Sequence, residues 1–119
     1  MNCKIVGYEY KTLEVTLSPG ESFYAERGCI VYVEEGLQRD AEFNGSGQAS
    51  GFGNILGGVI RSALSGESIL IIHFNNNSNS QKKMVLSGSY CSLIPIKLDG
   101  ENLICRRGHY VASSDKVHL

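Results

Sequence analysis

The side chains best suited to chemistry are three histidines and four cysteines, but their spacing specifies no reaction. There is no His-x-His pair, and no two cysteines form the C-x-x-C pattern of zinc and redox sites. The chain also has neither a G-x-S-x-G nucleophile motif nor the Gly-Lys-Ser/Thr ending of a phosphate-binding loop. We therefore expect no enzyme activity, no bound metal and no cofactor. The histidines are His73, His109 and His118.

The cysteines predict free thiols, with disulfides as the alternative. Each lies among apolar or β-branched residues, which is typical of buried free thiols in a reducing compartment. Charges at Lys4 and Glu9 interrupt any signal-peptide core, so we expect a cytoplasmic protein. The cysteines are Cys3, Cys29, Cys91 and Cys105.

Basic and aromatic residues form a candidate ligand surface. Such side chains contact phosphates and stack on bases in proteins that bind single strands. The chain, however, has 11 Lys and Arg against 12 Asp and Glu, a net charge of −1, so no global field attracts nucleic acid. A module that binds single-stranded nucleic acid or a small ligand is therefore the alternative function. The candidate residues are Lys82, Lys83, Arg106, Arg107 and Tyr110.

A glycine-rich apolar stretch suggests a contact between copies of the chain. Residues 45–58 contain six glycines, and the pattern that follows predicts at most one short helix near 54–64. So apolar a stretch is hard to bury within one small domain, and an exposed apolar patch marks a contact site. The alternative is that it plugs one end of the fold. The candidate self-association residues are Phe52, Ile55, Leu56, Val59 and Ile60.

The elements that must position these residues are short strands. With 119 residues, 42% of them apolar, the chain has the length and composition of one folded domain, which we place at 1–119. Its 14 glycines and two prolines indicate many turns, and its longest apolar run, 69–72, is too short to span a membrane. Strands are predicted at 3–8, 12–17, 22–26, 29–35, 37–43, 68–74, 82–87, 90–97, 102–106 and 109–113.

A weak internal repeat links several of these strands. Residues 17–32 and 98–112 both run through a leucine, a Gly-Glu turn, a short strand, an Arg-Gly pair and a second strand. A third Gly-Glu pair precedes the strand at 68–74. A glycine permits each turn, and a second glycine permits a bulge or bend. We interpret the repeated Glu and Arg as turn and rim residues, the alternative being a ring of ligand-binding side chains.

Taken together, these motifs resemble a known family. The stretches LSPGESFYAERGCIVYVEEGL, ILGGVIRSALSGES and LDGENL followed by GHYVASSDKV are similar to the altered-inheritance-of-mitochondria-type family of uncharacterised proteins, of which this chain resembles the N-terminal part or a shortened member. The resemblance implies an all-β sandwich related to the double-stranded β-helix, like that of the tryptophan RNA-binding attenuation protein. It also implies homo-oligomers, trimeric or ring-like, and no established enzyme activity.

The leading functional prediction is accordingly a non-enzymatic, homo-oligomeric β scaffold. Such a protein would present a multivalent surface to an unidentified protein partner.

Overall fold

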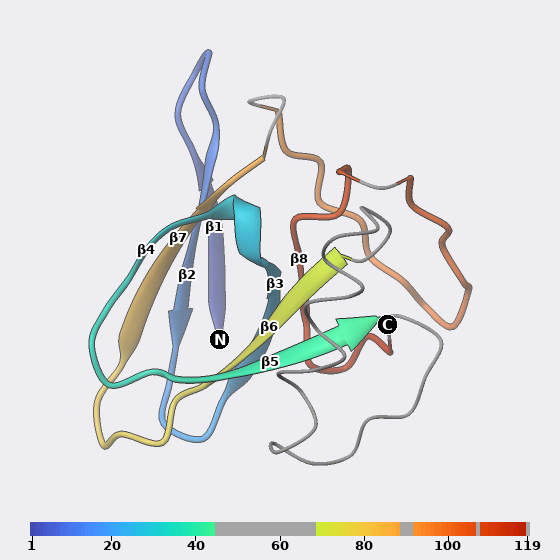
Figure 1. The fold of residues 1–119 in the computed structure, drawn as a ribbon. Coiled ribbons are helices and arrows are strands. Elements are labelled where there is room, and N and C mark those ends of the chain that lie inside the picture. The colour runs from blue at the N-terminus through green and yellow to red at the C-terminus, as the bar shows by residue number, and fades with distance from the viewer. Residues whose placement is uncertain (45–68, 89–91, 107, 119) are drawn as a thin grey trace.

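Two four-stranded antiparallel sheets form the described part of the protein (Figure 1). The computed structural model describes residues 1–44, 69–88, 92–106 and 108–118. The strand order is β1-β2-β7-β4 in the first sheet and β5-β6-β3-β8 in the second. The strands are β1 (Asn2–Val6), β2 (Thr12–Leu17), β3 (Ser22–Glu26), β4 (Ile30–Val33), β5 (Gln38–Asn44), β6 (Ile69–Asn75), β7 (Lys82–Ser87) and β8 (Ala112–Ser114). The predicted all-β sandwich is confirmed.

The core lies between the two sheets and follows from period-two alternation. In β2, Val15 and Leu17 are fully buried, whereas Glu14 and Thr16, which alternate with them along the strand, face outward. Every buried side chain of this kind leaves water, and its burial stabilises the fold by roughly 1.5–3 kcal/mol. The buried cluster is made by Val15, Leu17, Phe23, Ala25, Leu37, Phe74, Met84 and Leu86.

Among the described strands, the chain passes from one sheet to the other five times, after β2, β3, β4, β6 and β7. The turn after β2 is the predicted Pro-Gly turn, in which Gly20 has a φ of +80° and the Glu21 N–H donates to the Ser18 carbonyl at 3.1 Å. Between β3 and β4, a short 3-10 turn, η1 (Arg27–Cys29), reverses the chain. The register of β4 against β7 then shifts between Ile30 and Tyr32, which is a β-bulge close to the predicted bend.

A buried asparagine joins two of these crossings. The side chain of Asn76 is fully buried, and its amide N–H groups donate to the carbonyls of Leu17 and Ser80, both at 2.8 Å. Its side-chain oxygen accepts from the backbone N–H and the hydroxyl of Ser78. Its backbone N–H donates to Glu21, and its carbonyl accepts from Gly20. Asn76 therefore ties the β2–β3 turn to the β6–β7 turn.

Replacing Asn76 with alanine should lower the free energy of unfolding by about 2–4 kcal/mol, because two carbonyls and an N–H would lose their partners at a buried site. Urea denaturation measures this loss. The matched control is Asn77→Ala, since Asn77 is exposed and should tolerate the change within about 0.5 kcal/mol. Equal midpoints for N76A and the wild-type protein would contradict this role.

Glu21 stabilises the same end of the sandwich through its carboxylate. One oxygen accepts from the Ser18 N–H at 2.7 Å, and the other pairs with the N-terminal ammonium of Met1. The hydrogen bond from that ammonium, followed by the one from Ser18, lowers the pKa of Glu21 below its ordinary value of 4.5. The carboxylate is therefore favoured by folding.

This lowered pKa predicts a pH dependence of stability. The contribution of Glu21 should be complete above about pH 4.5 and should be lost as the pH falls through the lower pKa of the folded state. Thermal unfolding of the wild-type protein and of E21Q between pH 6 and pH 3 measures the effect. The wild-type Tm should fall more steeply with acid than that of E21Q, and parallel curves would contradict the assignment.

The predicted strands near the C-terminus are wrong in part. None of residues 92–106 belongs to a strand, and the last strand spans Ala112–Ser114 instead of 109–113. The alternation predicted strands there, but a strand also needs a neighbour to pair with, and Pro95 has no N–H to donate. The second repeat thus keeps its glycine turn, in which Gly100 has a φ of +102°. Its residues 102–106, however, form no strand, whereas the corresponding residues of the first repeat form β3. The predicted helix near 54–64 lies outside the described residues.

Candidate functional site

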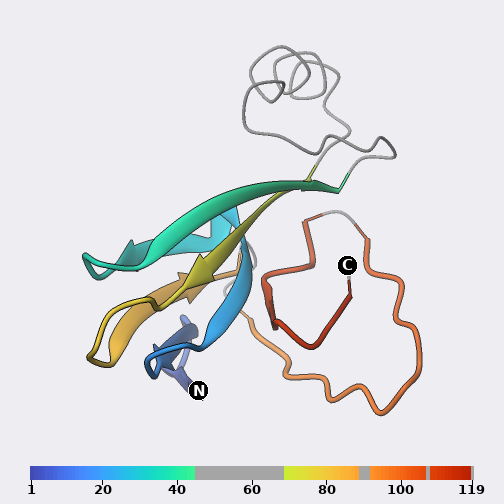
Figure 2. The same cartoon turned by 90° about the horizontal axis from the view of Figure 1, so that it is seen from below.

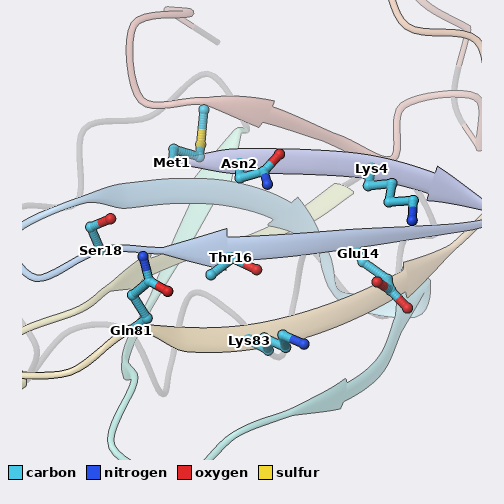
Figure 3. Close-up of a pocket in the computed structure, with 8 residues that line it drawn as sticks. All are labelled: Met1, Asn2, Lys4, Glu14, Thr16, Ser18, Gln81 and Lys83. Atoms are coloured by element: carbon cyan, nitrogen blue, oxygen red, sulfur yellow. The ribbon is translucent and has the colours of Figure 1, made fainter.

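Outward-facing side chains of β1, β2 and β7 line an open polar depression of about 500 Å³ (Figure 3). The strands alternate, so the residues next to these in the sequence, such as Val15 and Met84, point into the core instead. Figure 3 shows that the depression crosses three adjacent strands of one sheet. Its lining consists of Met1, Asn2, Lys4, Glu14, Thr16, Ser18, Gln81 and Lys83.

Sheet register arranges the polar groups in cross-strand rows. Asn2 pairs with Thr16, which pairs on its other side with Lys83, so an amide, a hydroxyl and an ammonium lie in line. In the next row, Lys4 lies opposite Glu14. The sequence interpretation included Lys83 but missed the other four. For Glu14 and Thr16 the signal was the polar alternation within 12–16, which becomes informative only once the pairing of β2 is known.

A second surface is the extended segment 92–106, which runs outside the two sheets (Figure 2). It carries apolar side chains, yet most of them face solvent. Ile94 is 81% exposed and Ile104 is 97% exposed. Ile96 and Leu103 are at least half exposed as well. Several exposed apolar residues on one segment are typical of contact surfaces.

The segment is held in place at defined points. A side chain at Gly88 would come within 3.2 Å of Leu93 and 3.5 Å of Val111, so these two apolar residues pack where β7 ends. Farther along, the Asp99 N–H donates to the Glu101 carboxylate at 2.9 Å around the Gly100 turn. This supports the interpretation of the repeated Gly-Glu pair as a turn device.

The outward face of the second sheet carries a polar and aromatic cluster. The rings of Tyr24 and His73 stack with centroids 4.4 Å apart, and Asn75 lies between His73 and Asp40 at 3.4 Å and 3.5 Å. Nearby, the Tyr110 hydroxyl bonds to Ser113 at 2.8 Å. Burial raises the pKa of Tyr110 to about 12, so this phenol stays neutral at physiological pH. Among the described residues, no three His, Cys, Asp or Glu side chains gather into a metal site.

The residues of the predicted ligand surface lie on different sheets. Lys82 and Lys83 are consecutive on β7, so their side chains take opposite faces of the first sheet. Tyr110 lies beside β8 of the second sheet, and Arg106 is exposed in the extended segment. Arg107 lies outside the described residues, as do all five predicted self-association residues, Phe52, Ile55, Leu56, Val59 and Ile60.

The three described cysteines are free, but the prediction that they are buried is wrong for two of them. Cys29 is buried, whereas Cys3 and Cys105 are exposed. Cys3 lies on the edge strand β1, and Cys105 lies in the segment outside the sheets, so apolar neighbours in the sequence do not cover them. Burial, followed by a hydrogen bond with Glu26, raises the pKa of Cys29 to about 12. Cys91 lies outside the described residues.

Thiol reactivity should separate these cysteines. In a C91S background at pH 8, a maleimide should label Cys3 and Cys105 in the native protein, because both are accessible. Cys3 should react more slowly, because partial burial raises the pKa of its thiol. Cys29 should react only after unfolding, since it is buried and its thiolate is scarce below its raised pKa. Mass spectrometry of the digested protein measures the sites. Labelling of native Cys29 as fast as Cys105 would contradict this.

Comparison with known proteins identifies the family. The model of the mitochondrial biogenesis AIM24 family matches residues 3–119. The chain belongs to this family. The family resemblance inferred from the sequence is therefore confirmed. In the described part of the protein, no helix has the length and apolar character needed to cross a membrane.

Two relatives found in this comparison come from Streptococcus pyogenes. An uncharacterised protein of the serotype M6 strain is 36% identical over 63 residues, which are 53% of this chain and 25% of that protein. An X-ray structure of another S. pyogenes protein aligns at 27% identity and a TM-score of 0.47, covering 74% of this chain and 38% of that one. The chain thus spans well under half the length of these relatives.

Proposed function

We propose that this AIM24 protein is a non-enzymatic scaffold that assembles into a closed homo-oligomer in the cytoplasm. The observation that carries the proposal is the extended segment 92–106, in which Ile94, Ile96 and Ile104 are exposed and with which none of the described strands pairs. Burying such side chains against another chain would remove apolar surface from water at about 25 cal/mol per Å². The proposed occupant of this surface is a second copy.

The receiving surface in this proposal is the edge strand β4. Among the described strands β4 has one neighbour, β7, so its other edge is open to pairing. It also carries exposed apolar side chains, with Val31 at 57% and Tyr32 at 50%. An extended segment adding to an open edge combines backbone hydrogen bonds with side-chain burial.

Joining two different surfaces makes the contact head-to-tail. A head-to-tail contact repeats from copy to copy and closes into a ring when the rotation between neighbours permits, as the predicted trimer or ring requires. The net charge of −1 raises little repulsion between copies. The free thiols of Cys3 and Cys105 support placing the assembly in a reducing compartment.

Charge substitutions should break the assembly from either side. Ile94→Asp and Val31→Asp should each reduce the mass in light scattering to that of the monomer, because an unpaired carboxylate would be buried at the contact. Tyr8→Asp is the matched control, since Tyr8 is 95% exposed at the tip of the β1–β2 hairpin and outside both surfaces.

Mixing the two variants distinguishes a head-to-tail contact from a symmetric one. The I94D variant keeps an intact β4 and V31D keeps an intact segment, so an equimolar mixture should form a heterodimer through one complete contact. A wild-type protein that is monomeric at high concentration would overturn the scaffold proposal. Assembly that survives both substitutions would overturn the assignment of these surfaces.

A further inference from the structure

We propose that the row Asn2–Thr16–Lys83, the donor row, binds the phosphate group of a small phosphate monoester. The row crosses β1, β2 and β7 within the polar depression and lies on the other face of the first sheet from the core (Figure 3). Nothing in the proposed assembly uses it.

The donor row has the right chemistry for an oxyanion. The amide of Asn2, the hydroxyl of Thr16 and the ammonium of Lys83 can each donate a hydrogen bond, and no carboxylate lies in the row. Adjacent strands lie about 4.8 Å apart, so the two longer side chains can converge on an anion above Thr16. A hydrogen bond from an ammonium to phosphate is about twice as strong as one between neutral groups.

The position of Lys83 is fixed from the neighbouring strand end. Its backbone N–H donates to the Glu34 carboxylate at 2.8 Å, and its carbonyl accepts from the Glu34 N–H at 3.0 Å. The Glu34 carboxylate therefore bonds to the backbone of Lys83 and not to its ammonium. Within the described residues, the Lys83 ammonium itself forms no ion pair. A lysine whose backbone is held and whose ammonium has no counter-ion among the described residues favours an anionic ligand.

The remaining charges around the depression determine its selectivity. Glu14 lies one row away and opposes an anion, but Lys4 lies directly opposite Glu14 and offsets it. The ammonium of Met1 is paired with Glu21, which also lies outside the donor row. Among the lining side chains, Lys4 and Lys83 therefore exceed Glu14 by one positive charge, while the Glu34 carboxylate, which accepts from the Lys83 N–H, lies outside the lining. One such charge and a volume of about 500 Å³ suit a single small ligand rather than a nucleic-acid backbone, which needs several phosphate contacts.

An NMR titration with inorganic phosphate tests the proposal. Phosphate replaces chloride at constant ionic strength, and the chemical shifts of the backbone amides report binding. Saturable shifts should centre on Asn2, Thr16 and Lys83. The K83Q substitution should weaken binding by roughly three- to tenfold, and T16V should weaken it through loss of the hydroxyl. K116Q is the matched control, because Lys116 is exposed and lies outside the depression.

The variant that best separates binding from a structural role is Glu14→Gln. Among the described residues it removes the one carboxylate that lines the depression, so phosphate affinity should rise by roughly threefold. Glycerol phosphate in solution and phosphatidic acid in vesicles then distinguish a soluble ester from a lipid headgroup. Absence of saturable shifts, equal affinity in K83Q and K116Q, or tighter binding of single-stranded RNA with increasing length would overturn the proposal.

Discussion

The fold depends on the buried amide of Asn76. The chain changes sheets after β2 and again after β6, and the backbone polar groups at both crossings must find partners away from water. Asn76 supplies them, because its side chain and backbone together bond to Leu17, Ser80, Ser78, Glu21 and Gly20. The β2–β7 and β3–β6 pairings both begin beside this point. One residue thus holds two turns that are far apart in the sequence.

With these pairings in place, each sheet presents one face to the core and one face outward. The inner faces are almost entirely apolar and form a single buried cluster. The outer faces differ in chemistry. The first sheet presents hydroxyl, amide and ammonium groups, and the second presents stacked rings with amide and carboxylate groups. The segment 92–106 belongs to neither sheet, which is why its apolar side chains are available for a partner.

Much of the fold was predictable, because strands and turns leave short-range patterns in the sequence. Alternation located β2, β3 and β7 to the residue, and the Pro-Gly sequence located the turn after β2. The candidate sites were less predictable. Alternation alone also predicted strands within 92–106, where pairing partners are missing among the described strands. Likewise, apolar neighbours suggested that Cys3 and Cys105 are buried, although coverage depends on which strand lies at an edge.

The sequence by itself therefore determined the family, the all-β class and most strands, since each of these is written in local periodicity and turn residues. Only the tertiary structure decided which residues lie side by side. Asn2, Thr16 and Lys83 are distant in the sequence and meet through antiparallel register, while the adjacent Lys82 and Lys83 are separated onto opposite faces. The physical reason is that strand pairing sets long-range neighbours, and a period of two sends successive side chains in opposite directions.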